Sequence, residues 1–462
     1  MRILLVSAYE LGHQPVHVAS PAAGLLEAGH DVRAVDVAVD EWKVSVTDWA
    51  DAIAFSVPMH TAMRLAVGLA RGVRQRHPLL PICFYGLYAA VSRDSTVGTV
   101  ADVVLAGEYE PALLAWATAA TDSTTAAASP IQLGRTSFSV PAREVLPPLD
   151  RYARLVVGDE SWLAGAVEAT HGCSHRCRHC PLPVIYDGQL RRVGADVVLA
   201  DVDQLVAAGA GHVTFADPDF LNAPSHSLRV VRAVHVRHPE LTFDCTTKVE
   251  HILAHAELWP ELAAAGCRFV VSAFESVDDD VLGRLDKGHV AADASAAVTL
   301  LRRHGVEIRP SWLPFTPWAT PASVSGLLDF VVAHDLVDNV DPVQYSIRLL
   351  VPEGSLMLEL ADMRAAVRGY NAQRLSWEWE AFDRAADQLQ REIAALVERR
   401  AGEPAKAVFP EVRALVSAAT GEPAVPVELV SRGPAAARPR LSEPWFCCSE
   451  PTSAQQIVAG LS

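Results

Sequence analysis

The stretch HGCSHRCRHCPLP, residues 171–183, places three of the chain's eight cysteines within eight positions. These are Cys173, Cys177 and Cys180, which form a Cys-x3-Cys-x2-Cys loop directly after a strand candidate. The arginines and histidines around them favour thiolates, because nearby positive charge lowers the pKa of a thiol. Three thiolates fill three corners of a cubane [4Fe–4S] cluster, and the fourth iron stays open to substrate or cofactor atoms.

A zinc site is the main alternative for this loop. Zinc prefers four Cys or His ligands, and His171, His175 or His179 could complete a set with the three cysteines. Spacing alone leaves both metals open. The loop follows the first strand of an apparent barrel, where a reactive centre is expected, and this position favours the cluster.

Strand-like and helix-like segments alternate from the strand candidate that leads into the loop through residue 357. The six strand candidates, from the first onward, are GAVEATHGC, HVTFAD, LTFDCTT, CRFVVSAFES, VEIRPSWLPF and VQYSIRLL. Helical stretches such as ADVVLADVDQLVAAG separate most of them. Residues 161–357 are therefore predicted to form a partial (β/α)6 barrel whose reactive residues lie at the carboxyl ends of the strands.

Four further segments are predicted around this α/β barrel. Residues 1–118 alternate short apolar runs with helical patterns, which indicates a doubly wound, Rossmann-like parallel sheet. Residues 119–160 have the composition of a linker. Residues 358–420 are predicted to be helical, and residues 421–462 to be a second linker and a tail.

Composition limits the partners and the compartment. The net charge of −16 opposes nucleic acid and anionic membrane surfaces, and no apolar run is long enough to span a bilayer. MRILLVSA at the start fits a first strand better than a signal peptide, so we expect a cytoplasmic protein. Cys83, Cys245 and Cys267 fall in or beside strand candidates and are predicted to be core residues.

The cysteine loop and the strands behind it resemble the radical S-adenosylmethionine (SAM) superfamily. The resemblance implies that the three cysteines hold a [4Fe–4S] cluster, that SAM chelates its open iron, and that reductive cleavage of SAM gives a 5′-deoxyadenosyl radical. A reductant such as flavodoxin or ferredoxin is then needed. In the family the residue before the last cysteine is usually aromatic and lies near the cofactor, and here it is His179.

The same resemblance suggests further SAM contacts. Asp217 and Asp219 replace the usual Gly-Gly-Glu segment, although a strand-ending turn and helix cap would also explain them. Glu275 occupies the place of a ribose or amino-acid contact, and Lys287 that of a partner for the SAM carboxylate, with surface positions as the alternative. Ile308 matches a strand that borders adenine, and core packing would explain it equally well.

The amino-terminal segment resembles the cobalamin-binding domain that often precedes radical SAM cores, on the evidence of GEYEP and of LPPLDRY in the linker. The Asp-x-His-x-x-Gly ligand motif is absent. His13, His17 and His60 fall in loops at the predicted crevice, where solvated side chains are favoured over ligands. Tyr85-Gly86-Leu87-Tyr88 stands where relatives carry Gly-Gly, and its bulk is expected to hinder the nucleotide tail of cobalamin.

The chain ends with Cys447-Cys448-Ser449-Glu450-Pro451 after Trp445 and Phe446. This ending resembles a radical SAM group named for a Cys-Sec-Ala-Glu-Pro or Cys-Cys-Ala-Glu-Pro tail, which implies nucleophilic or redox chemistry at Cys448. Carriage of a thiophilic substrate or metalloid, a redox pair and ligation of an auxiliary centre all remain open roles.

Two functions follow from these residues. The first is a radical SAM enzyme that modifies a small-molecule substrate, by methyl transfer if cobalamin binds and by hydrogen abstraction followed by rearrangement or thiol-linked transfer otherwise. The second is a zinc-stabilised protein that binds or senses a metal or metalloid through its tail. Metal analysis separates them, because a cluster predicts about four iron atoms per chain.

Overall fold

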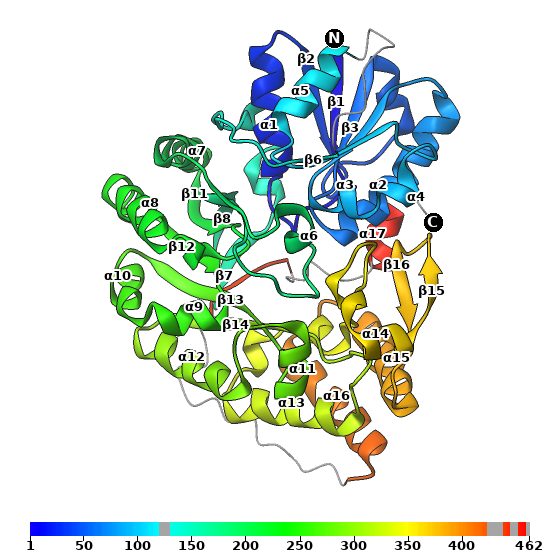
Figure 1. Ribbon diagram of the computed structural model, residues 1–462. Helices are drawn as coiled ribbons and strands as arrows, with labels where there is room; N and C mark the ends of the chain where they lie inside the picture. The colour runs from blue at the N-terminus through cyan, green and yellow to red at the C-terminus, as the bar shows by residue number, and fades with distance from the viewer. Residues whose placement is uncertain (120–129, 423–437, 444–450, 459–462) are drawn as a thin grey trace.

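The computed structural model describes residues 1–119, 130–422, 438–443 and 451–458 (Figure 1). Its amino-terminal part is built on a six-stranded sheet of order β2-β1-β3-β4-β5-β6, in which every neighbouring pair is parallel. The strands are β1 (Arg2–Ser7), β2 (Asp31–Asp36), β3 (Ala52–Ser56), β4 (Ile82–Tyr85), β5 (Val103–Gly107) and β6 (Ile131–Gln132).

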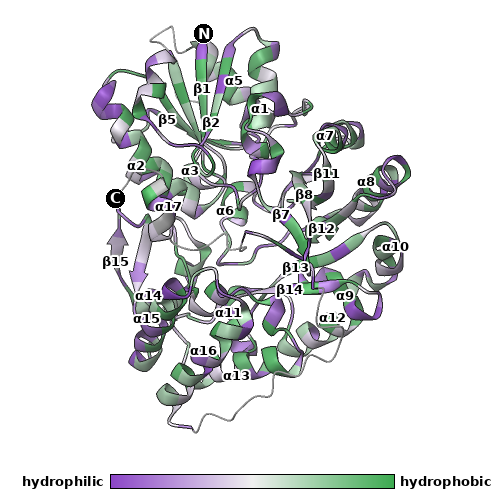
Figure 2. Cartoon of the chain, turned by 180° about the vertical axis from the view of Figure 1, so that it is seen from behind, coloured by the Kyte–Doolittle hydropathy of each residue, from purple (hydrophilic) through white to green (hydrophobic). Residues whose placement is uncertain are grey.

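Helices cover both faces of this sheet, so the doubly wound prediction is confirmed (Figures 1 and 2). One apolar cluster lies between the sheet and α1 and α5, and a second lies between the opposite face and α2 and α3. Strands that are buried on both faces have near-continuous apolar sequences, as RILLV in β1 does. The helices are α1 (Val16–Glu27), η1 (Val44–Trp49), α2 (His60–Arg76), α3 (Leu87–Val91), α4 (Arg93–Thr96) and α5 (Glu110–Ala119).

A second sheet has the order β14-β13-β12-β11-β8-β7-β17. Its five strands from β8 to β14 are parallel and form the partial barrel, while β7 and β17 extend the β8 edge in antiparallel pairing. The strands are β7 (Arg154–Val157), β8 (Glu160–Val167), β11 (Ala210–Phe215), β12 (Thr242–Thr246), β13 (Cys267–Glu275), β14 (Glu307–Trp312) and β17 (Arg440–Leu441).

Helices pack along the outside of this sheet and close the largest apolar cluster of the protein. They are α7 (Ala195–Ala207), α8 (Pro224–Arg237), α9 (Val249–Ala254), η5 (Ala256–Leu258), α10 (Trp259–Ala264), α11 (Asp279–Leu285), α12 (Ala291–Arg303) and α13 (Pro321–Ala333). Two 3-10 helices, η2 (Arg143–Val145) and η3 (Leu149–Arg151), lie between the two sheets in the chain. Within the barrel, β9 (Thr170–Gly172), α6 (Leu182–Tyr186) and β10 (Leu190–Arg192) follow β8, and η4 (Phe220–Asn222) follows β11. The predicted partial barrel is thus confirmed.

The sixth strand candidate, VQYSIRLL, does not form a strand. Its first half is the 3-10 helix η7 (Pro342–Ser346), and only Arg348 makes an isolated parallel bridge, to Phe315. Pro342 lacks a backbone N–H and fixes its φ near the helical value, which favours the turn over a paired strand.

The carboxyl-terminal part is mainly helical, as the sequence indicates, but it also contains a hairpin rich in aromatic residues. Its elements are η6 (Val337–Asn339), η8 (Leu356–Glu359), α14 (Ala361–Ala366), β15 (Val367–Asn371), β16 (Ser376–Trp379), α15 (Arg384–Arg399), α16 (Ala405–Thr420) and α17 (Ser453–Val458).

Segments with the composition of linkers contribute to both sheets. Within the segment 119–160, β6 extends the first sheet and β7 the second. In the tail, Arg440 and Leu441 pair with Val156 and Leu155 of β7. Short strands of this kind give almost no periodic signal, because two residues cannot define an alternating pattern.

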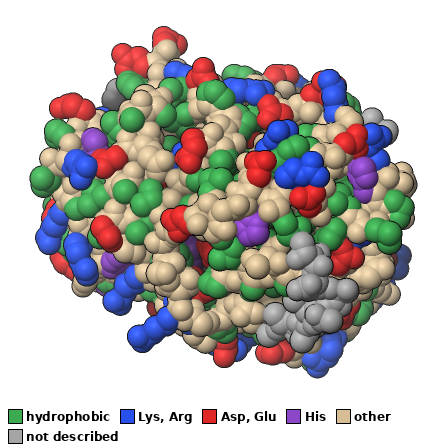
Figure 3. All heavy atoms as spheres, turned by 90° about the horizontal axis from the view of Figure 1, so that it is seen from above, with side chains coloured by type: hydrophobic (Ala, Val, Ile, Leu, Met, Phe, Trp, Pro, Cys, Tyr) green, Lys and Arg blue, Asp and Glu red, His purple; other side chains and the backbone are tan. Residues whose placement is uncertain are grey.

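Acidic and basic side chains are interspersed over the face shown in Figure 3, and hydrophobic side chains are scattered among them. The large exposed hydrophobic residues, such as Leu79 and Val236, come from separate elements. No helix in the described parts of the chain is long and apolar enough to cross a bilayer.

Candidate active site

The three cysteines follow β8 and β9 at the carboxyl end of the barrel sheet. Cys173 and Cys177 are buried and Cys180 is partly buried. Gly172 makes the turn into the loop with a φ of 77°, and a Cβ atom there would lie 2.3 Å from the backbone oxygen of Gln189. Glycine is needed at this position because a larger residue would meet both strain and a backbone clash.

The arginines of the loop do not account for thiolate formation. Arg176 pairs with Asp187 and Arg178 lies near Asp286, so their charges are directed to carboxylates. Burial raises the pKa of the Cys173 thiol, and the side-chain amide of Asn222, which donates to its Sγ at 3.1 Å, lowers it. The metal itself would then deprotonate the thiols on binding.

Each of the three loop histidines contacts a carboxylate or another imidazole. His171 lies between Glu108 and Glu168, the Nε2 of His175 lies 3.1 Å from that of His251, and His179 contacts Glu275. These partners engage imidazole nitrogens that a zinc site of three cysteines and one histidine would need, which favours the cluster.

The predicted residues Glu275, Lys287 and His179 are brought together beside the cysteines. Glu275 Oε1 lies 3.1 Å from both Lys287 Nζ and His179 Nε2. Burial would raise the pKa of Glu275, but the charges of Lys287 and His179 outweigh it and lower the pKa to about 2. Burial likewise lowers the pKa of Lys287, whereas Glu275 and the nearby Cys177 and Cys180 raise it, with a net increase. The group is therefore an ionised pair at the edge of the cysteine loop.

Asp217 and Asp219, which follow β11, face different partners. Asp217 is buried and accepts hydrogen bonds from the backbone N–H of Ala169 and the hydroxyl of Thr170, which fixes the entry to the cysteine loop. Burial raises the pKa of Asp217 to about 7. The Oδ2 atom of Asp219 lies 2.7 Å from His251 Nδ1. Ile308, on β14, is fully buried in the barrel core.

A row of alternating carboxylates and imidazoles joins the two sheets. It runs Glu10, His17, Glu168, His171, Glu108, with separations of 3.0 Å for the first pair and 3.3 Å for each of the other three. Burial lowers the pKa of His17 and His171, but the carboxylates outweigh it and raise both pKa values well above the ordinary one. The carboxyl edges of the two sheets are thus tied by buried charges.

The expectation of solvated loop histidines is wrong for His13 and His60, which are buried. The side chain of His17 is 24% exposed and contacts Glu10 and Glu168. Sequence reasoning also missed Glu168, Glu108 and His251. The only available signals are that Glu168 directly follows β8 and that Glu108 lies in GEYEP, because partners this far apart in the chain leave no local pattern.

Buried acidic and aromatic side chains follow the strands at the carboxyl edge of the first sheet. Tyr85 packs into the apolar cluster on one face of the sheet and Tyr88 into that on the other, so both tyrosines are core residues. Glu10 Oε2 and Glu108 Oε1 are buried and make no hydrogen bond within the described residues. The amide side chains of a corrinoid present N–H donors, so these two acceptors fit such a ligand.

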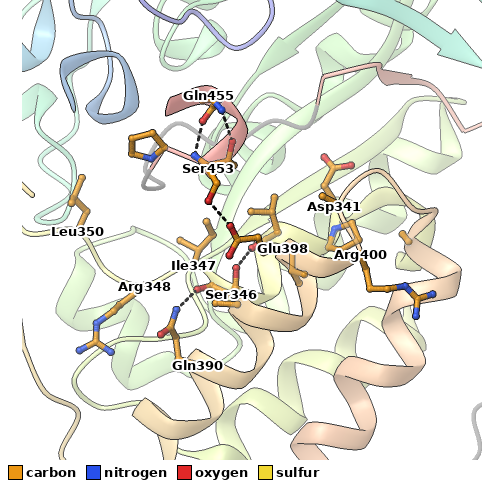
Figure 4. A pocket seen from close by; sticks show the side chains of 18 of the residues that line it. Asp341, Ser346, Ile347, Arg348, Leu350, Gln390, Glu398, Arg400, Ser453 and Gln455 are labelled. Carbon is orange, nitrogen blue, oxygen red and sulfur yellow. Dashed lines mark hydrogen bonds between the residues drawn. The ribbon is translucent and has the colours of Figure 1, made fainter. Parts of the chain in front are cut away.

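A separate pocket of about 1780 Å³ lies between the carboxyl-terminal helices and the tail (Figure 4). Its lining includes Arg348, Glu398 and Arg400 but none of the three loop cysteines. Ser453 of α17 donates a hydrogen bond to Glu398 at 2.8 Å, which docks the tail helix on α15 (Figure 4). Glu443 and Pro451 also line it.

The predicted tail residues Cys447 and Cys448 lie outside the described residues. Four residues before Cys447 in the chain, Glu443 accepts a hydrogen bond from the hydroxyl of Tyr9 at 2.8 Å. Gly12 has a φ of 73°, and a Cβ atom there would lie 2.6 Å from the Cβ of Glu443, so glycine permits this close approach. The tail thus contacts the amino-terminal domain next to Glu10.

Comparisons with known proteins agree with this geometry. Residues 167–313 match the family model of the radical SAM superfamily. A search of curated protein sequences finds no match. Among solved structures, OxsB, a cobalamin-dependent S-adenosylmethionine radical enzyme with aqua-cobalamin bound, is similar with a TM-score of 0.66 and 13% identity, over 87% of this chain and 67% of that one.

A second similar structure is the radical S-adenosylmethionine methyltransferase TsrM from Kitasatospora setae, with cobalamin and a [4Fe–4S] cluster bound. It has a TM-score of 0.62 and 18% identity, over 79% of each chain. The radical SAM family uses a [4Fe–4S] cluster and SAM, which are therefore the cofactors of residues 167–313. The family match therefore places a radical SAM domain at residues 167–313, which contains the cysteine loop and follows an amino-terminal doubly wound domain.

Proposed function

We propose that Cys173, Cys177 and Cys180 hold a [4Fe–4S] cluster at which SAM is cleaved to modify a small-molecule substrate. The observation that carries this proposal is the ionised pair of Glu275 and Lys287, with His179 beside it, at the edge of the three-cysteine loop. When bound, the reduced cluster and SAM supply a carbon radical that removes a hydrogen atom from an unactivated position.

The residues of this chain bind and orient SAM in this proposal. Lys287 Nζ pairs with the carboxylate of SAM, and Glu275 accepts from its amino or ribose groups. Asp219, near His175 of the loop, offers a second carboxylate, whereas the two hydrogen bonds of Asp217 favour a role in fixing the loop. Burial strengthens these charge pairs because the surrounding dielectric is low.

The test is reconstitution of the protein with iron and sulfide without oxygen, followed by reduction in the presence of SAM. We expect about four iron atoms per chain, a broad absorbance near roughly 400 nm and release of 5′-deoxyadenosine. Cys177→Ala should lose all three. Cys83→Ala, which changes a buried cysteine of the amino-terminal core, should keep them. Zinc without iron in the wild-type protein would instead support the zinc-stabilised binding protein.

Methyl transfer with cobalamin is the reaction that we favour. The fold shared with OxsB and TsrM supports it, as do the two buried acceptors Glu10 Oε2 and Glu108 Oε1 in the crevice. Cobalamin would supply a transferable methyl group there. Protein mixed with hydroxocobalamin and then desalted should retain a corrinoid spectrum. Loss of the corrinoid would leave hydrogen abstraction followed by rearrangement or thiol-linked transfer.

We further propose that Cys447 and Cys448 assist the reaction as a thiol pair. The support is the position of the described flanks of this segment. Glu443 contacts Tyr9 beside the crevice, and Ser453 docks the tail helix on Glu398. A pair of adjacent thiols can bind one soft ion or form a strained disulfide, so a thiophilic substrate or a redox step would suit it.

A further inference from the structure

His175, Asp219 and His251 converge from three separate elements. His175 lies in the cysteine loop, Asp219 directly precedes η4, and His251 lies on α9. One ligand atom from each lies within 4.8 Å of those of the other two. The Nε2 atoms of the two histidines are 3.1 Å apart, and His175 Nε2 lies 3.9 Å from Asp219 Oδ2.

These separations match the ligands of one metal ion. Two ligand atoms that each lie about 2.1 Å from a tetrahedral ion are about 3.4 Å apart. His175 Nε2 lies 3.1 Å from His251 Nε2 and 3.9 Å from Asp219 Oδ2, which bracket this distance, so the ion would bind His251 through Nε2. Two imidazoles and one carboxylate form a donor set that suits divalent zinc, iron or manganese.

The hydrogen bonds that the structure describes leave this group unsatisfied. The side chain of Asp219 is only 1% exposed, yet its Oδ2 makes no hydrogen bond. It lies 2.7 Å from His251 Nδ1, which also makes none. Burial of a carboxylate oxygen without a hydrogen bond is costly, and a cation bound nearby would compensate it.

We propose that His175, Asp219 and His251 bind a divalent first-row transition metal ion, separate from the cluster of the three cysteines. The ion would join the cysteine loop to the carboxyl ends of β11 and β12. Asn222, three residues after Asp219, already donates to Cys173 Sγ, so the same turn contacts both groups. With three protein ligands, the ion keeps an open position for water or for an oxygen or nitrogen atom of the substrate.

This site does not need the cluster, so it can be tested apart from the proposed function. The two proposals assign different side chains: Asp219 binds the ion, and Glu275 and Lys287 bind SAM. Wild-type protein is reconstituted with iron and sulfide, mixed with Zn²⁺, passed over a chelating column and analysed for both metals. We expect about one zinc ion per chain in addition to the cluster iron.

Two variants decide the assignment. His251→Ala should retain at most about one tenth of the wild-type zinc and should keep the cluster iron. His255→Ala is the matched control, because His255 directly follows α9 and packs beside His251 but lies outside the proposed ligand set, and it should retain the wild-type amount of zinc. The proposal is wrong if the wild-type protein retains no zinc, or if His251→Ala and His255→Ala retain equal amounts.

A third variant separates the two metal sites. Cys173→Ala/Cys177→Ala/Cys180→Ala should lose the iron but still bind Co²⁺, with weak absorption bands and without the intense near-ultraviolet band of a thiolate ligand. Adding His251→Ala should abolish that binding. If the retained metal instead depends on the cysteines and not on His251, the site is the zinc alternative for the cysteine loop, and our proposal is wrong.

Discussion

Glu275 Oε1 lies 3.1 Å from Lys287 Nζ at the carboxyl end of β13, and both side chains are buried. Glu275 has a φ of 62°, a conformation that residues other than glycine rarely adopt, and the strand pairing shifts register just before it. Strained backbone of this kind is concentrated at functional sites, because the surrounding structure must hold it in place. The pair lies where the proposed function needs charges for SAM.

Lys287→Met should weaken SAM binding. The change removes the cation proposed for the SAM carboxylate and leaves Glu275 buried without its main partner, so we expect an increase of about 30-fold in the dissociation constant, or roughly 2 kcal/mol. Titration of the reconstituted protein with SAM measures it. Lys406→Met is the control, because Lys406 pairs with Asp338 on the surface of α16, and its effect should be within about twofold. Equal affinities in the two variants would contradict the role of Lys287.

Glu168→Gln should destabilise the contact between the two sheets. Glu168 lies 3.3 Å from both His17 and His171, whose pKa values its charge raises. Removal of that charge leaves His17 with Glu10 alone and His171 with Glu108 alone, at a cost of about 2 kcal/mol. Denaturant unfolding at pH 7 measures the loss. Glu160→Gln, at the exposed start of the same strand, should unfold like the wild-type protein. If the free energy of unfolding of Glu168→Gln equals that of Glu160→Gln, the charge of Glu168 does not stabilise the protein.

The stability of the protein should depend on pH through Asp36. Burial raises the pKa of this carboxyl group from 3.8 to about 7, against the opposing hydrogen bonds from Ala38 and Tyr152. The folded state therefore binds the proton more tightly than the unfolded state. This contribution is complete below pH 3.8 and is lost as the pH rises through about 7.

Asp36→Asn should remove that dependence. Between pH 5 and 7 the free energy of unfolding of the wild-type protein falls by at most about 1.4 kcal/mol per pH unit from this group, and the variant should show a flatter profile. Denaturant midpoints at several pH values measure the difference. Asp31→Asn changes an exposed carboxylate of the same strand and should keep the wild-type slope.

Cys447→Ser/Cys448→Ser should abolish product formation and leave SAM cleavage intact. The reason is that the tail cysteines are proposed to act on the substrate, whereas the radical is generated at the three loop cysteines. Release of 5′-deoxyadenosine and product formation are measured in the same reaction. Ser449→Ala in the same tail is the control and should form product normally. Unchanged product formation in the double variant would rule out the proposed role.

The cofactor chemistry was predictable because its residues are close together in the chain. Cys173, Cys177 and Cys180 occupy eight positions, and the apolar runs of the strands repeat in a regular alternation with helical patterns. Glu275 and Lys287 could be placed because each follows an identifiable strand or helix. VQYSIRLL was misjudged because an apolar run after a proline suits a turn as well as a strand.

The sequence alone determined the fold class, the three cysteines and the type of cofactor, because each depends on local pattern. Only the tertiary structure decided that the loop histidines face Glu108, Glu168, His251 and Glu275. It also decided that Asp217 fixes the loop while Asp219 meets two imidazoles. Most of these contacts join residues that are tens of positions apart in the chain, and their distances and burial arise only when the strands of the barrel and the first sheet pack together.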